Sequence, residues 1–190
     1  MLLFTVIAWL TFWGTYAFCS QPSGEILDHP QQLDVLYLVG TNALLSIPAY
    51  ILLNYIKLSS IQLGFISSFI VLVLGTELWF YFSHRLLHSR YLYPYHKIHH
   101  LYTEPTAVTA LYCHGFEFIF CNFLSVVWTQ MFIDYPWYIL LMWYSLTAFN
   151  TTRSHQLVDG YHYIHHGNSK KNFGVLGIFD HLMGTYQAAK

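Results

Sequence analysis

The chain has 190 residues, of which 55% are hydrophobic and 19% aromatic, whereas only 9% are charged. Ordinary soluble domains carry roughly 25% charged residues, so this composition excludes a typical water-soluble protein and predicts a membrane-embedded one. The formal net charge of -1, with histidine neutral, gives no electrostatic basis for binding nucleic acid.

The first part of the chain contains three long apolar runs separated by short polar breaks. Residues 1–18 lack the basic start and the small-residue cleavage site of a secretory signal, so we expect a retained membrane segment. Residues 20–32 are polar and contain two prolines and a glycine, which predicts a loop. Residues 33–56 and 61–82 are each long enough to cross a bilayer core as a helix.

Residues 83–115 are rich in histidine and charged side chains, so we expect them outside the hydrocarbon. Residues 116–150 are apolar again except for an Asp-Tyr-Pro sequence that begins at Asp134, which predicts a turn between two membrane helices. Such a hairpin returns the chain to the face that it left, so residues 151–190 are expected beside residues 83–115. Most lysines and arginines fall in these two segments, and the positive-inside tendency therefore predicts that both face the cytosol.

Twelve histidines in a chain of this length, beside only eight lysines and arginines, need an explanation. His84 and His88 lie four residues apart at the end of a predicted helix, a spacing that places both imidazoles on one helical face. Two further clusters share the spacing His-x-x-His-His, and their offsets predict that each cluster converges on one face. These clusters are His96, His99 and His100, then His162, His165 and His166, with His155 shortly before the second.

These nine histidines predict a site for two metal ions. Imidazole is a common metal ligand near neutral pH because its pKa is about 6.5, which leaves a nitrogen lone pair free at little cost. Nine nitrogens exceed what one ion accepts, whereas two ions with four or five each use them all and leave positions for water or a small molecule. A pH sensor would not need the repeated helical spacing, and a haem with two axial histidines needs only one pair.

The motifs around these histidines resemble the fatty acid hydroxylase and sterol desaturase superfamily of membrane di-iron enzymes, over about residues 77–185. The first histidine box of that family, with its upstream acid and tyrosine, is matched by Glu77-x-x-x-Tyr81-x-x-His84-Arg85-x-x-His88. The second and third boxes are matched by His96-x-x-His99-His100 and His162-x-x-His165-His166, and the closing segment by Asn172-Phe173-Gly174, Asp180 and Gly184-Thr185.

Two positions depart from the family's pattern. Gly115 follows His114 where the family usually has proline, within a segment, His114-x-x-Glu117, that resembles the family's His-Pro-x-Glu. Asp159 stands four residues after His155, where some hydroxylases have a second histidine. Whether His114 or Asp159 joins the metal ligands therefore stays open.

The pattern and the resemblance together predict an all-α fold, in which residues 1–190 form one membrane-embedded domain. We expect an integral membrane bundle of four to five helices, capped on the cytosolic side by short helices that carry the histidine-rich dimetal site. Residues 1–82 would supply membrane segments, 83–115 the first histidine-box region, 116–150 the membrane hairpin and 151–190 the second histidine-box region.

The resemblance implies an oxygen-dependent oxidoreductase of lipid metabolism. Two iron ions would activate dioxygen, and hydrogen would be removed from an unactivated C–H bond of a fatty acyl chain, a sterol or a related lipid, which gives hydroxylation or desaturation. Iron is expected because zinc cannot change valence, although zinc can occupy the same nitrogens after purification. Electrons would come from a cytochrome b-type protein with its reductase, or from a ferredoxin, because no haem or flavin domain fits in the remaining residues. In a eukaryote we expect the endoplasmic reticulum.

Glu77 and Tyr81 are the candidate catalytic residues. An ionisable group inside an apolar segment, such as Glu77, is a functional-site hypothesis by default, with the orientation of a ligating histidine as the alternative. Tyr81 lies on the face of His84 and is expected either to hydrogen-bond near the metals or to anchor the helix at the membrane interface. Two other functions stay open: a membrane protein that binds or transports metal, and a catalytically silent scaffold. A transporter should place its ligands near the bilayer midplane, whereas these clusters lie beyond the apolar runs.

Overall fold

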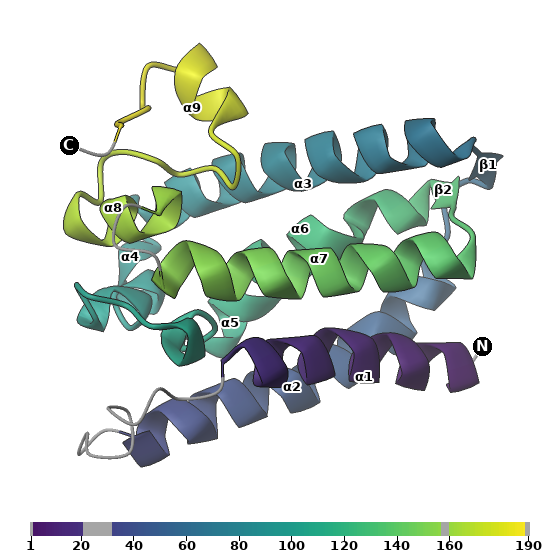
Figure 1. The fold of residues 1–190 in the computed structure, drawn as a ribbon, viewed down its shortest axis with the longest axis horizontal. Coiled ribbons are helices and arrows are strands. Elements are labelled where there is room, and N and C mark those ends of the chain that lie inside the picture. Colours follow the sequence, from purple (N-terminus) through teal and green to yellow (C-terminus); the bar gives the residue numbers. More distant parts are fainter. Residues whose placement is uncertain (1, 21–31, 157–159, 189–190) are drawn as a thin grey trace.

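The computed structural model describes residues 2–20, 32–156 and 160–188, and these are mostly helical, as predicted. The long helices run side by side along the longest axis of the molecule (Figure 1). They are α1 (Leu2–Cys19), α2 (Gln32–Tyr55), α3 (Phe65–Leu87) and α7 (Trp137–Gln156). The ends of α3 and α7 that carry histidines lie at the same end of the molecule, which confirms the predicted placement of the two histidine regions.

A segmented helical stretch packs against α3 and forms the first arm of the predicted hairpin. Its consecutive parts are α5 (Gly115–Glu117), the π-helix η4 (Phe118–Phe123), α6 (Leu124–Val127) and the 3₁₀-helix η5 (Trp128–Met131). The chain then reverses through β2 (Ile133–Asp134), which pairs in parallel with β1 (Ile61–Gln62). Lys57 forms an ion pair with Asp134 beside this reversal, at the end of the molecule farthest from the histidines.

Two predicted boundaries were wrong. The helix expected over residues 61–82 begins at Phe65, because Ile61 and Gln62 pair with β2, and it continues to Leu87. The helix expected to end at residue 150 continues to Gln156, because Thr152 and His155 are buried in its last turns. The first difference carries His84 onto α3 and the second carries His155 onto α7, so both histidines have positions fixed by long helices.

Within the described ranges of the chain, two helices are long and apolar enough to cross a membrane, and they cover Leu33–Tyr55 and Phe65–Leu87. Only 22% and 33% of the residues in their apolar windows are buried inside the protein, so most of their apolar side chains face outward. Leu44 and Ile66, for example, are 64% and 73% exposed. Continuous apolar surface on this scale is unfavourable in water, and the chain is therefore a membrane protein.

Short helices form a cap at the histidine end of the bundle (Figure 1). They are α4 (Tyr93–His96), η2 (His99–Leu101), η3 (Ala107–Thr109), α8 (Tyr161–Gly167) and α9 (Ile178–Leu182). Hydrogen bonds tie this cap to the first two helices: the Tyr16 hydroxyl donates to the Val108 carbonyl at 2.9 Å, and Asn42 Nδ2 donates to the carbonyls of Leu111 and Cys113 at 3.1 and 3.0 Å. The cap therefore has a fixed position over the bundle.

Candidate metal centre

Nine histidines come together at the capped end, and they are the nine that the sequence singles out. Their side chains form two groups in which the nearest ligand atoms all lie within 4.8 Å of one another. The five-histidine group consists of His84, His88, His96, His100 and His165. The four-histidine group consists of His99, His155, His162 and His166.

Each His-x-x-His-His motif divides its members between the two groups, while the rings within a motif stay close together, with centroids 5.5 Å apart for His96 and His99 and 5.1 Å apart for His162 and His165. His96 and His100 enter the five-histidine group, while His99 enters the other. In α8 the pattern is reversed, because His162 and His166 enter the four-histidine group and His165 crosses to the five-histidine group. On a helix at about 100° per residue, the i+3 side chain lies about 60° to one side of residue i and the i+4 side chain about 40° to the other, so one helical face can supply ligands to two neighbouring groups. The two groups are thereby interlocked.

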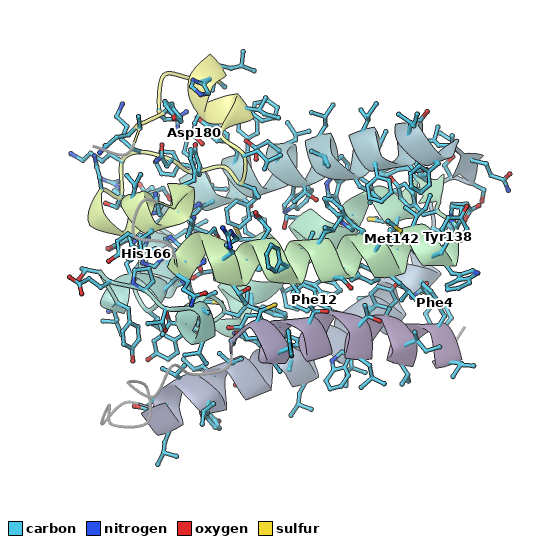
Figure 2. All side chains as sticks on the ribbon, in the orientation of Figure 1. Phe4, Phe12, Tyr138, Met142, His166 and Asp180 are labelled. Carbon is cyan, nitrogen blue, oxygen red and sulfur yellow. The ribbon has the colours of Figure 1, made fainter. Side chains whose placement is uncertain are left out.

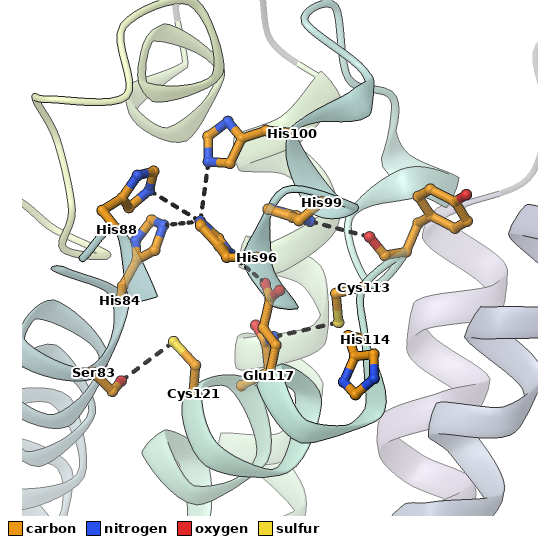
Figure 3. Close-up of polar contacts among 12 residues, drawn as sticks. Ser83, His84, His88, His96, His99, His100, Cys113, His114, Glu117 and Cys121 are labelled. Atoms are coloured by element: carbon orange, nitrogen blue, oxygen red, sulfur yellow. Dashed lines mark hydrogen bonds and ion pairs between the residues drawn. The ribbon is translucent and has the colours of Figure 1, made fainter. Parts of the chain in front are cut away.

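The Nε2 atoms point inward in both groups. In the five-histidine group, His96 Nε2 lies 3.1 Å from that of His84 and 3.0 Å from those of His88 and His100 (Figure 3). His165 Nε2 completes this group at 3.0 Å from His88 and 3.2 Å from His100. In the four-histidine group the shared neighbour is His99 Nε2, which lies 3.2 to 3.4 Å from the Nε2 atoms of His155, His162 and His166.

Carbonyl or carboxylate oxygens lie beside the outer ring nitrogens of six of the nine histidines. Nδ1 of His84 lies 2.7 Å from the Phe173 carbonyl, and the other pairs are His165 with Lys171 at 2.6 Å, His166 with Tyr102 at 2.9 Å, His155 with Thr151 at 2.8 Å and His99 with Tyr112 at 3.3 Å. A carbonyl can only accept, so each Nδ1 carries the proton and donates it. The Nε2 lone pairs of these rings are therefore free and directed into the groups.

This donor set fits metal ions. Lone pairs only 3.0 to 3.4 Å apart repel one another unless a cation lies between them. Ligand nitrogens about 2.1 Å from an ion are separated by about 3.0 to 3.4 Å from their neighbours in octahedral or tetrahedral geometry, which is the spacing present here. Burial, together with repulsion from His100, lowers the pKa of His88 to about 3, and burial lowers that of His100 to about 4. Both rings are neutral near pH 7, the form that binds metal.

Glu77 does not contact an imidazole in the described part of the chain. Its fully buried carboxylate accepts hydrogen bonds from the backbone amides of Val175 and Leu176, both at 2.7 Å, and of Ile178 at 2.8 Å. The carboxylate therefore fixes the loop between α8 and α9. The catalytic role predicted for Glu77 stays a hypothesis, and its contacts favour positioning.

Asp180 holds the same loop from the other side and lies in the yellow segment of Figure 2. It accepts from the amides of Phe173 at 2.9 Å and Gly174 at 2.7 Å. A Cβ on Gly174 would lie 2.6 Å from Glu77 Oε1 and 2.9 Å from Asp180 Oδ2, so only glycine fits between the two acids. Since the Phe173 carbonyl accepts from His84, the two carboxylates orient this ligand candidate through the loop.

Tyr81 also points to this loop instead of the imidazoles. Its ring is fully buried, and its hydroxyl lies 3.1 Å from Thr185 Oγ1 and accepts from Arg85 Nη1 at 2.8 Å. The ring packs against Phe173 and Phe179. Both alternatives for Tyr81, a contact near the metals and an interfacial anchor, stay predictions, and the geometry adds a third role as a support for the loop.

His114 and Glu117 have different positions. His114 caps α5 by accepting from the Phe116 amide at 3.1 Å, it belongs to neither group, and Figure 3 shows its ring apart from those of His96 and His99. Glu117 is buried, with Oε1 2.9 Å from His96 Nδ1. Gly115, which replaces the expected proline, lies against α2, where a Cβ would be 2.9 Å from Leu45 Cδ1. Asp159, the other open position, lies outside the described residues.

A cavity of about 350 Å³ extends from both histidine groups into the helical bundle. Its imidazole end is lined by His84, His96, His99, His155 and His162. Phe12, which lies between α1 and α7 in Figure 2, belongs to the apolar wall, and Trp143 lies at the far end. Twelve residues of α7 separate Trp143 from His155, a length of about 18 Å, which is close to the depth of one leaflet of a bilayer core.

Sequence reasoning missed the carbonyl acceptors and the cavity. Backbone oxygens carry no side-chain signal, so no residue pattern marks the contacts of Tyr102, Tyr112 or Lys171 with the histidines. The cavity wall comes from helical elements distant in sequence, among them α1, α2, α3 and α7. For Glu117, by contrast, the spacing from His114 was a usable signal.

The chain is similar in sequence to a known protein family and to several known proteins. The model described as fatty acid hydroxylase matches residues 69–185. Fatty acid hydroxylase domain-containing protein 2 of Homo sapiens is 36% identical over 132 residues, which cover 64% of this chain and 39% of that protein. Very-long-chain aldehyde decarbonylase GL1-8 of Oryza sativa subsp. indica is 30% identical over 135 residues, which cover 68% of this chain and 49% of that protein.

Methylsterol monooxygenase 2-2 of Arabidopsis thaliana is 36% identical over 86 residues, or 44% of this chain and 30% of that protein. The chain thus spans less than half the length of these relatives. No solved structure matches the chain. The match over residues 69–185 confirms the resemblance that the histidine motifs predicted.

Proposed function

Because the chain belongs to the fatty acid hydroxylase family, we propose that it is an integral membrane, non-haem di-iron oxygenase that hydroxylates or desaturates a lipid. The observation that carries this proposal is that two groups of imidazoles open onto one end of an apolar cavity with the length of a lipid leaflet. The sterol and long-chain aldehyde substrates named in two relatives support a lipid as the substrate class.

Each histidine group would hold one iron ion, and zinc can occupy the same nitrogens after purification. The ligands proposed for one ion are His84, His88, His96, His100 and His165, and those for the other are His99, His155, His162 and His166. When bound, the iron pair supplies the redox chemistry that activates dioxygen, which zinc cannot supply.

The overall reaction needs electrons from outside the chain. In hydroxylation, one atom of dioxygen enters the C–H bond and the other leaves as water, with two electrons and two protons consumed. In desaturation, two hydrogens leave adjacent carbons and both oxygen atoms leave as water, with the same electron demand. We propose a cytochrome b-type protein with its reductase, or a ferredoxin, as the donor, because the described residues contain no haem-binding or flavin-binding domain.

The protein's own side chains bind and orient. The aromatic wall of the cavity excludes water and holds the lipid chain along α7, so that one C–H bond lies beside the imidazoles. Glu77, Asp180 and Tyr81 act as positioning residues, because they hold the loop whose carbonyls accept from His84 and His165. Glu117 orients the ring of His96 directly, since its Oε1 lies 2.9 Å from His96 Nδ1.

The proposed topology is multi-pass, with the histidine end in the cytosol and, in a eukaryote, residence in the endoplasmic reticulum. Its support is the distribution of basic residues, since Lys57 at the far end is paired with Asp134 while Arg85, Lys97 and Lys171 lie near the histidines. A lipid could then enter the cavity from the bilayer.

A matched pair of histidine variants tests the proposed function. We expect His99→Ala to lose bound metal and lipid oxidation, because His99 is the shared neighbour in the four-histidine group. His114→Ala is the control, since this ring lies outside both groups. Metal content and lipid oxidation would be measured for both proteins in nanodiscs with iron, dioxygen and a reductant.

Full metal content and full lipid oxidation in His99→Ala would contradict the proposal. Metal that is bound by the wild type without any lipid oxidation would favour the alternatives, a metal-binding protein or a silent scaffold.

A further inference from the structure

The wall of the cavity changes character along its length. Aromatic side chains line its middle, among them Trp9, Phe12 and Trp13 of α1. At the end farthest from the imidazoles, α1 contributes Thr5, α2 contributes Tyr50 and α7 contributes Tyr144 beside Trp143. These three hydroxyl-bearing side chains are buried, with exposed fractions of 4%, 7% and 3%. The end of the cavity farthest from the imidazoles therefore carries hydroxyl groups, although most of the cavity is apolar.

The two tyrosines belong to a hydrogen-bond network that is incomplete. Tyr144 donates its hydroxyl proton to Gln130 Oε1 at 2.9 Å, and the hydroxyls of Tyr50 and Tyr144 lie 2.8 Å apart. The Tyr50 hydroxyl also lies 3.4 Å from Gln130 Oε1. Whichever tyrosine donates to Gln130, the other donates to it, and the lone pairs of that other tyrosine have no donor among the described residues. Gln130 Nε2 is also buried and has no partner among the described residues, but Gln130 does not line the cavity, so the tyrosine hydroxyls are the groups that a ligand can reach. Buried polar groups are normally paired, so the network can accept one more polar group.

The charge of the residues that line the cavity limits which polar group can bind beside Tyr50 and Tyr144. Among the described residues, no lysine or arginine lines the cavity, and the carboxylic residues that do, Glu77 and Glu117, lie toward the imidazole end. A carboxylate or phosphate buried beside Tyr50 and Tyr144 would have no counter-ion, which is strongly unfavourable. A neutral hydroxyl, which both donates and accepts, fits the unpaired lone pairs.

We propose that the far end of the cavity binds the hydroxyl group of a long-chain neutral alcohol through Tyr50 and Tyr144. This inference rests on the proposed function for its claim that the alcohol is a substrate. Eleven residues of α7 separate Tyr144 from His155, a distance of about 16 Å along the helix. The bound hydroxyl thus fixes which carbon of the chain lies beside the imidazoles, and Tyr50 and Tyr144 determine both substrate class and oxidised position.

Fluorescence quenching tests this binding without turnover, because Trp9, Trp13 and Trp143 line the cavity. The probes are a long-chain alcohol brominated along its chain and the brominated alkane of equal length, added to the full chain in nanodiscs. We expect the alcohol to quench at a mole fraction about tenfold lower than the alkane, the selectivity of one buried hydrogen bond. Tyr50→Phe and Tyr144→Phe should reduce this preference to less than about twofold, with binding of the alkane unchanged.

Tyr135→Phe is the matched control, because Tyr135 is a buried tyrosine that does not line the cavity, and it should retain the tenfold preference. Equal quenching by both probes in the wild type, or a preference that survives both cavity substitutions, would overturn the inference. If Tyr144→Phe does not fold, Tyr50→Phe decides alone. An alcohol preference in a protein without lipid oxidation would support the binding site and refute the proposed function. Lipid oxidation without the alcohol preference would support the proposed function and refute the binding site.

Discussion

The two histidine groups draw on the same cap but are held by different parts of the molecule. In the five-histidine group, His84 and His165 donate to carbonyls of the loop that Glu77 and Asp180 fix. In the four-histidine group, the outer nitrogens of His99, His155 and His166 donate to carbonyls of residues 102–112 and of α7. Two neighbouring metal positions can therefore depend on separate supports, and damage to one support should be local.

The groups also differ in exposure and in the number of donors. His88 and His100 of the five-histidine group are half-buried, whereas every member of the four-histidine group is buried. The five-histidine group can lose one nitrogen and keep four, but the other group would keep only three. We infer that the four-histidine group is the more sensitive to a single substitution.

The largest expected difference comes from removing one histidine from each group. His155→Ala should remove the metal of the four-histidine group and lower lipid oxidation by more than about a hundredfold. Removing only the hydrogen-bond partner of a metal ligand typically costs about 10- to 100-fold, and removing the ligand itself should cost more. His100→Ala should keep both metals and a larger share of activity. Metal per chain and turnover would be measured together, and equal losses in the two variants would contradict the asymmetry.

An intermediate effect is expected when the support of the five-histidine group is changed. Glu77→Gln keeps the shape but removes the charge that three backbone amides share, so the loop should loosen. Metal affinity of the five-histidine group should fall about 10- to 100-fold, while that of the four-histidine group stays within error. Glu104→Gln, in an exposed part of the cap, is the control for a metal titration. A uniform loss from both groups would show that the supports are not separate.

The smallest effect is expected from the support of the other group. Asn42→Ala leaves the Leu111 and Cys113 carbonyls without their donor, on either side of the Tyr112 carbonyl that accepts from His99. The free energy of unfolding should fall by about 1–3 kcal/mol, and metal affinity of the four-histidine group should fall several-fold. Asn54→Ala, an exposed residue on the same helix, is the control in thermal unfolding. A loss confined to the five-histidine group would contradict the assignment of Asn42.

Local spacing was enough to predict which histidines meet. His84 and His88 needed only helical geometry, and the Asp-Tyr-Pro sequence at Asp134 correctly predicted the reversal that brings residues 83–115 and 151–190 to one end. The sequence could not show how His99 and His165 cross between groups, because that depends on how α4, η2 and α8 face one another. It could not show the contacts of Glu77 either, since its partners are backbone amides almost a hundred residues away.

The irregular arm of the hairpin was also beyond prediction. An apolar run such as residues 116–131 predicts a helix, but periodicity does not separate an α-helical turn from the π-helical turn at Phe118–Phe123. This turn follows Glu117 and contributes Cys121 and Asn122 to the cavity wall. The stretch packs against α3 and α2, and these contacts between distant segments are not encoded in any local pattern.

The crowding of imidazole lone pairs has a consequence for the protein's life in the cell. Without cations, nitrogens about 3 Å apart would push the two groups open, so the free energy of metal binding is also free energy of folding for the cap. Newly inserted chains that meet no metal would expose this end to proteases. The cellular supply of iron would then govern the abundance of the protein as well as its activity, through degradation of unloaded copies.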